Sequence, residues 1–226
     1  MCGRYTLRTP LQNVIDAFSA QSIPPELFGP RYNVAPTQDV LAVRVSCEDV
    51  RELVPLHWGL VPHWAADRSV GARMINARSE TLVDKPAYRD AFRRRRCLIP
   101  ADGFFEWAKA PGGKQPYLFQ LKDGGLFAFA GLWESWGRGD QRLDSCTILT
   151  TRPNDLVRPV HDRMPVILPV DARAAWLDPA ASRESLAPLL EPLAAERMTA
   201  MPVSKRVNRA TIDDPGCVER AESTLF

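Results

Sequence analysis

The sequence predicts a single α+β domain, built on an antiparallel, barrel-like β-sheet with a few flanking helices. Three observations support this prediction. The 226 residues suffice for one sizeable core, and no Gly/Ser-rich or Pro-rich stretch resembles a linker. Predicted strands outnumber predicted helices. The two do not alternate regularly along the chain, which disfavours a doubly wound parallel sheet.

Six segments have the apolar spacing that is typical of strands. They are Val40–Ser46, Leu53–Trp58, Tyr117–Leu121, Leu126–Leu132, Cys146–Thr150 and Val166–Leu168. Twenty prolines punctuate the connecting segments. We therefore expect many short strands joined by well-defined turns.

Helices are predicted in four segments, which are Leu11–Ala20, Pro86–Arg95, Asp171–Trp176 and Ser182–Leu190. Pro86 suits the first turn of its helix, and Ser182 suits an N-cap. The basic run Arg93–Arg96 is expected to be a solvated helix end, since charge runs usually face water. Residues 209–226 are expected to be a poorly ordered tail or packing cover.

The composition is that of an ordinary globular protein, with 45% hydrophobic and 25% charged residues. No apolar run approaches the roughly 20 residues of a membrane span, and no signal peptide is visible, so we expect a cytoplasmic monomer. The cysteines lack metal-ligand spacing, which predicts reduced thiols, no metal and no cofactor. A net charge of +2 does not establish a nucleic-acid partner, but 29 Lys and Arg can still line one groove.

Cys2 is the most informative residue, because removal of Met1 before a small residue would leave it with a free amine and a thiol. An α-amino group has a pKa of about 7.7–8.0, so part of it is unprotonated at neutral pH and can attack an aldehyde. The adjacent thiol can then close onto the imine carbon to give a thiazolidine. The alternative is that Cys2 is a small packing residue.

Several short segments resemble one family, the SOS response-associated peptidases. In order along the chain they are CGRYT at 2–6, RYNVAPTQ at 31–38, WGLVPHW at 58–64, INARSET at 75–81, CLIPADGFFEW at 97–107, HDRMPVIL at 161–168 and MPVSKRVN at 201–208. The resemblance spans residues 2–208 and implies a single domain of this type over 1–226.

The resemblance implies a protein that shields abasic sites in single-stranded DNA through a thiazolidine crosslink to Cys2. It also implies autoproteolytic removal of Met1. The active-site residues of the family match Cys2, Asn76, Glu106 and His161 of this chain.

Ordinary side-chain chemistry is compatible with these assignments. His161 can move protons near neutrality, as opening of the closed abasic sugar requires. Glu106 lies between aromatic residues that can desolvate it and raise its pKa, which suits a general acid/base. Asn76 can orient substrate through its amide. The alternatives are a structural histidine, a solvent-facing strand glutamate and a turn-capping asparagine.

DNA contacts are expected from residues close to these positions in the sequence. Arg4, Arg78 and Arg163 can hold phosphates, and Trp64 can stack on a base beside the lesion. Asn33 and Thr150 match family positions near the DNA path. Trp58, Trp107 and Trp133 are expected to be core residues.

Three other functions remain open from the sequence. An amino-terminal-cysteine amidotransferase uses the same residue as a nucleophile. In that class Cys-Gly opens an apolar strand, whereas the charged Arg4 follows Cys2-Gly3 here. A thiol peptidase using Cys2 and His161 would act on peptides. A non-catalytic single-strand binding module would bind intact and abasic strands equally.

Overall fold

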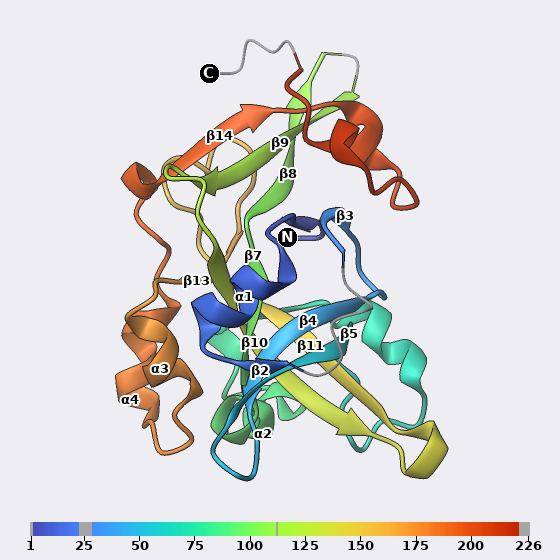
Figure 1. The fold of residues 1–226 in the computed structure, drawn as a ribbon, viewed down its shortest axis with the longest axis vertical. Coiled ribbons are helices and arrows are strands. Elements are labelled where there is room, and N and C mark those ends of the chain that lie inside the picture. Colours follow the sequence, from blue (N-terminus) through green and yellow to red (C-terminus); the bar gives the residue numbers. More distant parts are fainter. Residues whose placement is uncertain (1, 23–28, 112, 222–226) are drawn as a thin grey trace.

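The computed structural model describes residues 2–22, 29–111 and 113–221. Its helices are α1 (Leu11–Phe18), α2 (Pro86–Arg94), α3 (Ala172–Leu177) and α4 (Arg183–Leu186). They lie around two sheets, and α3 and α4 stand together on one side of the molecule (Figure 1). The predicted α+β architecture is therefore confirmed.

Five strands of the larger sheet close into a barrel, in the order β11 (Leu143–Thr151), β10 (Phe127–Trp136), β7 (Arg96–Ala101), β4 (Asp39–Val45) and β5 (Arg51–Trp58). Neighbours in this order are antiparallel. Closure comes from a parallel pairing of β11 with β5, in which Ser145 lies opposite His57 and Cys146 opposite Trp58. The barrel-like prediction is correct.

Short strands extend this sheet. They are β2 (Gln21–Ser22), β6 (Asn76–Arg78), β12 (Met164–Pro165) and β13 (Ile167–Leu168). Strand β6 runs parallel to β11, with Asn76 opposite Ile148. This pairing holds the three-residue strand Asn76–Arg78 against the barrel.

The second sheet has the order β14 (Met198–Pro202), β9 (Gly113–Leu121), β8 (Gly103–Ala110), β1 (Tyr5–Leu7) and β3 (Arg31–Val34). In Figure 1, β8, β9 and β14 lie at the opposite end of the molecule from α2. Gly103 allows β1 to cross β8 closely, since a Cβ there would lie 2.8 Å from the Thr6 hydroxyl and from Leu118.

An aromatic cluster joins the two sheets. The ring of Tyr5 packs edge-on against Trp58 and Phe129, while Phe104 stacks on Phe119 and meets Phe129. All five side chains are buried. Because Tyr5 is in this cluster, the amino-terminal strand is anchored in the core three residues after Cys2.

The six predicted strands and four predicted helices all occur, with ends shifted by a few residues. Pro86 is in the first turn of α2, and the Ser182 hydroxyl accepts a hydrogen bond from the Ser185 amide at 3.2 Å. The segment predicted as one helix from Ser182 is divided into α4 and a 3-10 turn over Ala187–Leu190. The missed strands are mostly short or rich in polar residues.

One prediction needs correction. Arg93 and Arg94 are exposed, but Arg96 is buried and begins β7, so the basic run is only partly a solvated helix end. Residues 209–221 pack on the second sheet, where Cys217 is fully buried, in agreement with the expected packing cover. The last five residues lie outside the described part. No described helix has the length and apolar character needed to cross a membrane.

Candidate active site

Cys2 is fully buried three residues before β1, with its thiol 3.9 Å from the carbonyl oxygen of Arg4. The backbone that follows Cys2 is fixed by β8: the Phe105 amide donates to the Arg4 carbonyl at 3.0 Å, and Tyr5 pairs with Phe104. Burial raises the pKa of the Cys2 thiol well above its ordinary range, so the group is a neutral thiol at physiological pH.

A buried carboxylate holds the rest of the amino-terminal segment. Asp102 accepts hydrogen bonds from the Thr6 hydroxyl at 2.6 Å, the Arg8 amide at 2.6 Å and the Thr9 amide at 2.9 Å. The Arg8 guanidinium adds an ion pair at 3.1 Å. Asp102 thus fixes β1, the strand that follows Cys2, a role that the sequence did not reveal.

Asn76 contacts Cys2 directly. Its Nδ2 donates to the Cys2 carbonyl oxygen at 2.9 Å, and its own carbonyl lies 3.4 Å from the Tyr88 hydroxyl of α2. Among the described residues, the buried Oδ1 of Asn76 has no hydrogen-bond partner. This oxygen can accept a further hydrogen bond beside the amino-terminal residue.

Glu106 lies on β8 and is 2% exposed. Burial is the main reason why the pKa of Glu106 rises to about 7, whereas the nearby positive charge of Lys114 opposes that rise. The alternative of a solvent-facing strand glutamate is therefore wrong. A carboxyl with this pKa can both donate and accept a proton at neutral pH.

His161 faces Glu106, with its Nε2 4.0 Å from a carboxylate oxygen of that residue. Its Nδ1 accepts a hydrogen bond from the Arg163 amide at 3.0 Å and also lies 2.9 Å from a carboxylate oxygen of Asp162. Partial burial lowers the pKa of His161, which favours the neutral imidazole. The pair can pass a proton between imidazole and carboxyl.

The loop that carries His161 is organised by Asn154. The Asn154 side chain accepts from the amides of Leu156 and Val157 at 3.1 and 3.0 Å and donates to the Leu193 carbonyl at 2.8 Å. The His161 amide in turn bonds the Val157 carbonyl at 2.9 Å. Asn154 is a positioning residue that sequence reasoning missed, although Asn before a turn is a known signal.

A cavity of about 450 Å³ opens over Glu106 and His161. Its other lining residues are Arg4, Trp107, Lys114 and Asn208. The Trp107 indole donates to the Asn208 side chain at 2.7 Å. Trp107 was expected in the core, but it is only partly buried and forms a wall of this cavity. Lys114 and Asn208 were not predicted.

Arg4 and Asn33 form one unit at the edge of this cavity. The Arg4 guanidinium donates to the Asn33 side chain at 2.9 Å and to the Val207 carbonyl at 2.6 Å. Asn33 is fully buried, and its amide also donates to the carbonyls of Arg209 and Ile212. Asn33 therefore lies behind Arg4 and joins β3 to the carboxyl-terminal segment.

The remaining predicted DNA-binding residues are less closely grouped. Arg163 makes a two-pronged ion pair with Glu80 at 2.6 and 2.9 Å and donates to the carbonyl of the buried Thr150 at 2.6 Å. The hydrogen bonds from Arg163 lower the pKa of Glu80. Arg78 is exposed at the end of β6, two residues beyond Asn76 and on the same face of the strand.

Trp64 is 59% exposed on the loop after β5. This loop is firmly attached to the barrel, since the Val61 amide donates to the Ser145 hydroxyl at 2.8 Å and the Trp136 indole to the Ala65 carbonyl at 2.7 Å. On β11, Ser145 lies three residues before Ile148, the residue that pairs with Asn76. Trp64 is thus a rigidly supported, solvent-facing indole.

Together these residues define a site around the amino-terminal end of the chain. The neutral, buried thiol of Cys2 lies near the Glu106 carboxyl, which titrates near neutrality and faces the uncharged imidazole of His161. This set suits proton transfer coupled to nucleophilic attack by the amino-terminal residue.

Comparison with known proteins agrees with a site of this kind. The family model described as SOS response associated peptidase (SRAP) matches residues 1–210, and the chain belongs to this family. Abasic site processing protein YoqW of Bacillus subtilis is 43% identical over 223 residues, covering 97% of this chain and 99% of that protein. Abasic site processing protein YoaM of the same organism is 45% identical over 212 residues, covering 92% and 93%.

The fold is also similar to that of a solved structure, a protein from Bacteroides thetaiotaomicron. The two superpose with a TM-score of 0.88 at 26% identity, over 98% of this chain and 100% of the other. The resemblance seen in the sequence motifs is therefore confirmed at the level of family and fold.

Proposed function

We propose that this protein captures abasic sites in single-stranded DNA by a thiazolidine crosslink through Cys2 after loss of Met1. The observation that carries the proposal is the placement of the buried Cys2 beside Asn76 and close to Glu106, whose pKa is about 7. Two relatives similar over nearly the whole chain are named as abasic site processing proteins, which supports the same substrate.

The first step joins the Cys2 amine to the sugar. The closed hemiacetal opens when a base removes its hydroxyl proton, a task for His161 together with Glu106. The nitrogen of Cys2 then attacks the aldehyde carbon, giving a carbinolamine. Protonated Glu106 donates a proton to the departing hydroxyl, water leaves, and an imine forms.

The second step closes the ring. The thiol sulfur adds to the imine carbon and forms a C–S bond, while the thiol proton is transferred to the nitrogen by way of the Glu106 carboxylate. The net reaction releases one water. Because burial keeps the thiol neutral, this addition needs such a base. Proximity within one residue makes it fast.

Asn76 positions the reacting residue in this proposal. It fixes the Cys2 carbonyl through Nδ2, and its Oδ1 can accept a hydrogen bond from the newly exposed amine. Arg4 and Lys114 at the cavity edge can hold phosphates, as can Arg78. Arg163 can do so by exchanging Glu80 for a phosphate, and Trp64 can stack on a base.

The thiol pKa weighs against peptidase activity on other proteins. A Cys–His peptidase needs a stabilised thiolate, whereas the Cys2 thiol is fully buried and its pKa is raised. Capture of an aldehyde by the amine does not need that thiolate. Removal of Met1 by the same residues remains part of the proposal, with Glu106 as the base.

The test uses an oligonucleotide with one abasic site, an intact oligonucleotide and two variants, Cys2→Ser and Cys2→Ala. Wild-type protein, with Met1 loss verified by intact mass, should give a heat-stable adduct only with the abasic strand. Both variants keep the amine, so they should give an adduct that survives only after borohydride reduction of the imine. A wild-type protein that lacks Met1 and forms no adduct would refute the proposal.

A further inference from the structure

Two cavities flank the carboxyl-terminal end of α2 and share no residue with the cavity over Glu106. The first, of about 450 Å³, is lined by Arg44, Cys47, Arg94, Arg96, Trp133 and Leu177, among others. The second, of about 300 Å³, is lined by Arg89, Arg93, Arg96, Arg183, Phe92 and Leu186, among others. Arg96 lies between them and lines both.

Arg96 is buried and makes no salt bridge with a carboxylate in the described part of the chain, although the charge of Asp178 lies near enough to favour its ionised form. The residue is 6% exposed. Its guanidinium donates to the backbone carbonyls of four residues, which are Phe92, Arg93, Trp176 and Asp178. These carbonyls satisfy its donors but do not neutralise its charge. A buried charge of this kind favours an anion in the cavities beside it.

The exposed arginines around Arg96 add to this field. Arg93, Arg94 and Arg183 make no salt bridge with any carboxylate in the described part of the chain, and Arg89 reaches only Asp90, at 4.0 Å. Arg44, by contrast, is paired with Glu52 at 3.4 Å and Asp144 at 3.0 Å. The excess positive charge therefore lies on the α2 side.

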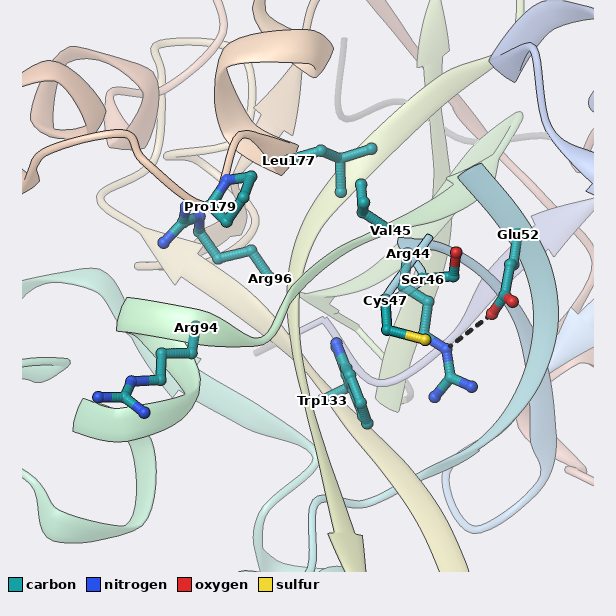
Figure 2. A pocket seen from close by; sticks show the side chains of 10 residues that line it. All are labelled: Arg44, Val45, Ser46, Cys47, Glu52, Arg94, Arg96, Trp133, Leu177 and Pro179. Atoms are coloured by element: carbon teal, nitrogen blue, oxygen red, sulfur yellow. Dashed lines mark hydrogen bonds and ion pairs between the residues drawn. The ribbon is translucent and has the colours of Figure 1, made fainter. Parts of the chain in front are cut away.

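Figure 2 shows how the first cavity is arranged. Arg94 and Arg96 lie on one side of it and Arg44 with Glu52 on the other, and Trp133 lies between the two groups. The Arg44 guanidinium stacks over the Trp133 ring at 4.5 Å. This stack gives a stiff, planar wall near Arg94 and Arg96, neither of which makes a salt bridge with another described residue.

We propose that this surface, made by Arg89, Arg93, Arg94, Arg183 and the Trp133 cavity, is a second binding site for phosphodiesters of a nucleic-acid strand. The inference rests on the proposed function, because it concerns the part of the DNA beyond the lesion. Arginine forks match phosphate oxygens, and a flat aromatic wall suits a base.

The position of α2 supports the same occupant. Tyr88 of this helix bonds the carbonyl of Asn76, the residue that contacts Cys2. Arg89 follows directly, and Arg93 is about 6 Å further along the helix axis at 1.5 Å per residue. The cavity over Glu106 is lined by residues of β8 and β9, which lie at the opposite end of the molecule from α2, so a strand in that cavity must extend well beyond the lesion to reach these arginines (Figure 1). An acidic peptide would need no such connection.

The experiment compares Arg93→Ala/Arg94→Ala with a matched double variant, Lys122→Ala/Arg138→Ala, which removes the same charge from other exposed positions. Intact strands of about 30 nucleotides should bind the first variant about tenfold more weakly at low salt, with a salt slope reduced by roughly 1.4. Binding to the control variant should change much less. Abasic oligonucleotides of about 6 nucleotides should crosslink to both variants as to wild type.

Cys47 provides a direct report on the first cavity, because it is exposed whereas the other four cysteines are buried. The long strand should slow alkylation of Cys47, and the short one should not. Equal binding by both variants, or protection by polyglutamate rather than by DNA, would overturn the proposal. Loss of short-strand crosslinking in wild type would instead refute the proposed function. A separate intact strand that protects Cys47 as well as a continuous one assigns the site to a second strand.

Discussion

The side-chain amide nitrogen of Asn76 lies 2.9 Å from the carbonyl oxygen of Cys2, and this bond connects strand β6, which extends the larger sheet, to the segment that leads into β1 of the second sheet. The orientation of the reactive residue thus depends on a side chain from the other sheet. Any change that removes the donor should loosen Cys2 without disturbing the core.

Asn76→Asp tests this bond, since it keeps the shape of the side chain and its acceptor but removes the donor. One hydrogen bond contributes about 0.5–1.5 kcal/mol, and an unpaired carbonyl adds to the loss, so crosslinking should slow by roughly tenfold or more. Single-turnover crosslinking to an abasic oligonucleotide measures it. Asn76→Ala, which introduces no charge, serves as the control, and an unchanged rate in both variants would remove Asn76 from the mechanism.

The raised pKa of Glu106 predicts a pH-dependent rate. Protonated Glu106 is needed to expel water, so the rate should fall as pH rises through about 7. At lower pH the rate should also fall, because the Cys2 amine becomes protonated and loses its nucleophilic lone pair. A bell-shaped profile is expected. Glu106→Gln should be much slower and lose the high-pH limb. A high-pH limb that survives in this variant would assign the titration to another group.

The same carboxyl predicts a stability difference. Its folded pKa of about 7 lies above the ordinary glutamate value of 4.5, so the native state binds more protons between these pH values and stability falls as pH rises across that window. Glu106→Gln should cancel this penalty and stabilise the protein above pH 7 by up to about 3 kcal/mol. Denaturant unfolding at pH 5 and pH 8 measures it, and the gain should be much smaller at the lower pH, which lies near the start of that window.

Asp102 should matter for stability more than any exposed acid. It accepts hydrogen bonds from Thr6, Arg8 and Thr9, and its removal leaves several of these donors unpaired near the core. Asp102→Ala should therefore cost roughly 2–4 kcal/mol and slow crosslinking through a displaced Cys2. Chemical denaturation of this variant and of Asp140→Ala, an exposed control, gives the comparison. Equal stability of the two would contradict the anchoring role.

The sequence predicted the barrel because its long strands have regular apolar spacing, as in Val40–Ser46 and Leu126–Leu132. Strands such as β1 and β6 were not predicted, because three residues give no periodicity and their pairing depends on partners far away in the sequence. The parallel closure of β11 on β5 is likewise a long-range contact that local patterns do not encode.

The site was predicted less evenly than the fold. Cys2, Asn76, Glu106 and His161 were named from motifs, and the structure brings them together. Asp102, Lys114 and Asn208 act through contacts between segments far apart in sequence, so no local pattern reveals them. Asn33 and Thr150 were matched to the DNA path, but both are buried, and Asn33 meets the cavity only through Arg4.

Trp64 offers the clearest separation of binding from folding. Its indole is 59% exposed on a loop that the barrel holds firmly, so Trp64→Ala should change the free energy of unfolding by no more than about 0.5 kcal/mol. If the indole stacks on a base, affinity for single-stranded DNA should fall by about 1–3 kcal/mol. Val170→Ala, at a residue that is 70% exposed, is a matched control that should bind like wild type. Because every base has an aromatic face, the loss for Trp64→Ala should be similar across base sequences, and a loss confined to one sequence would indicate a base-edge contact instead.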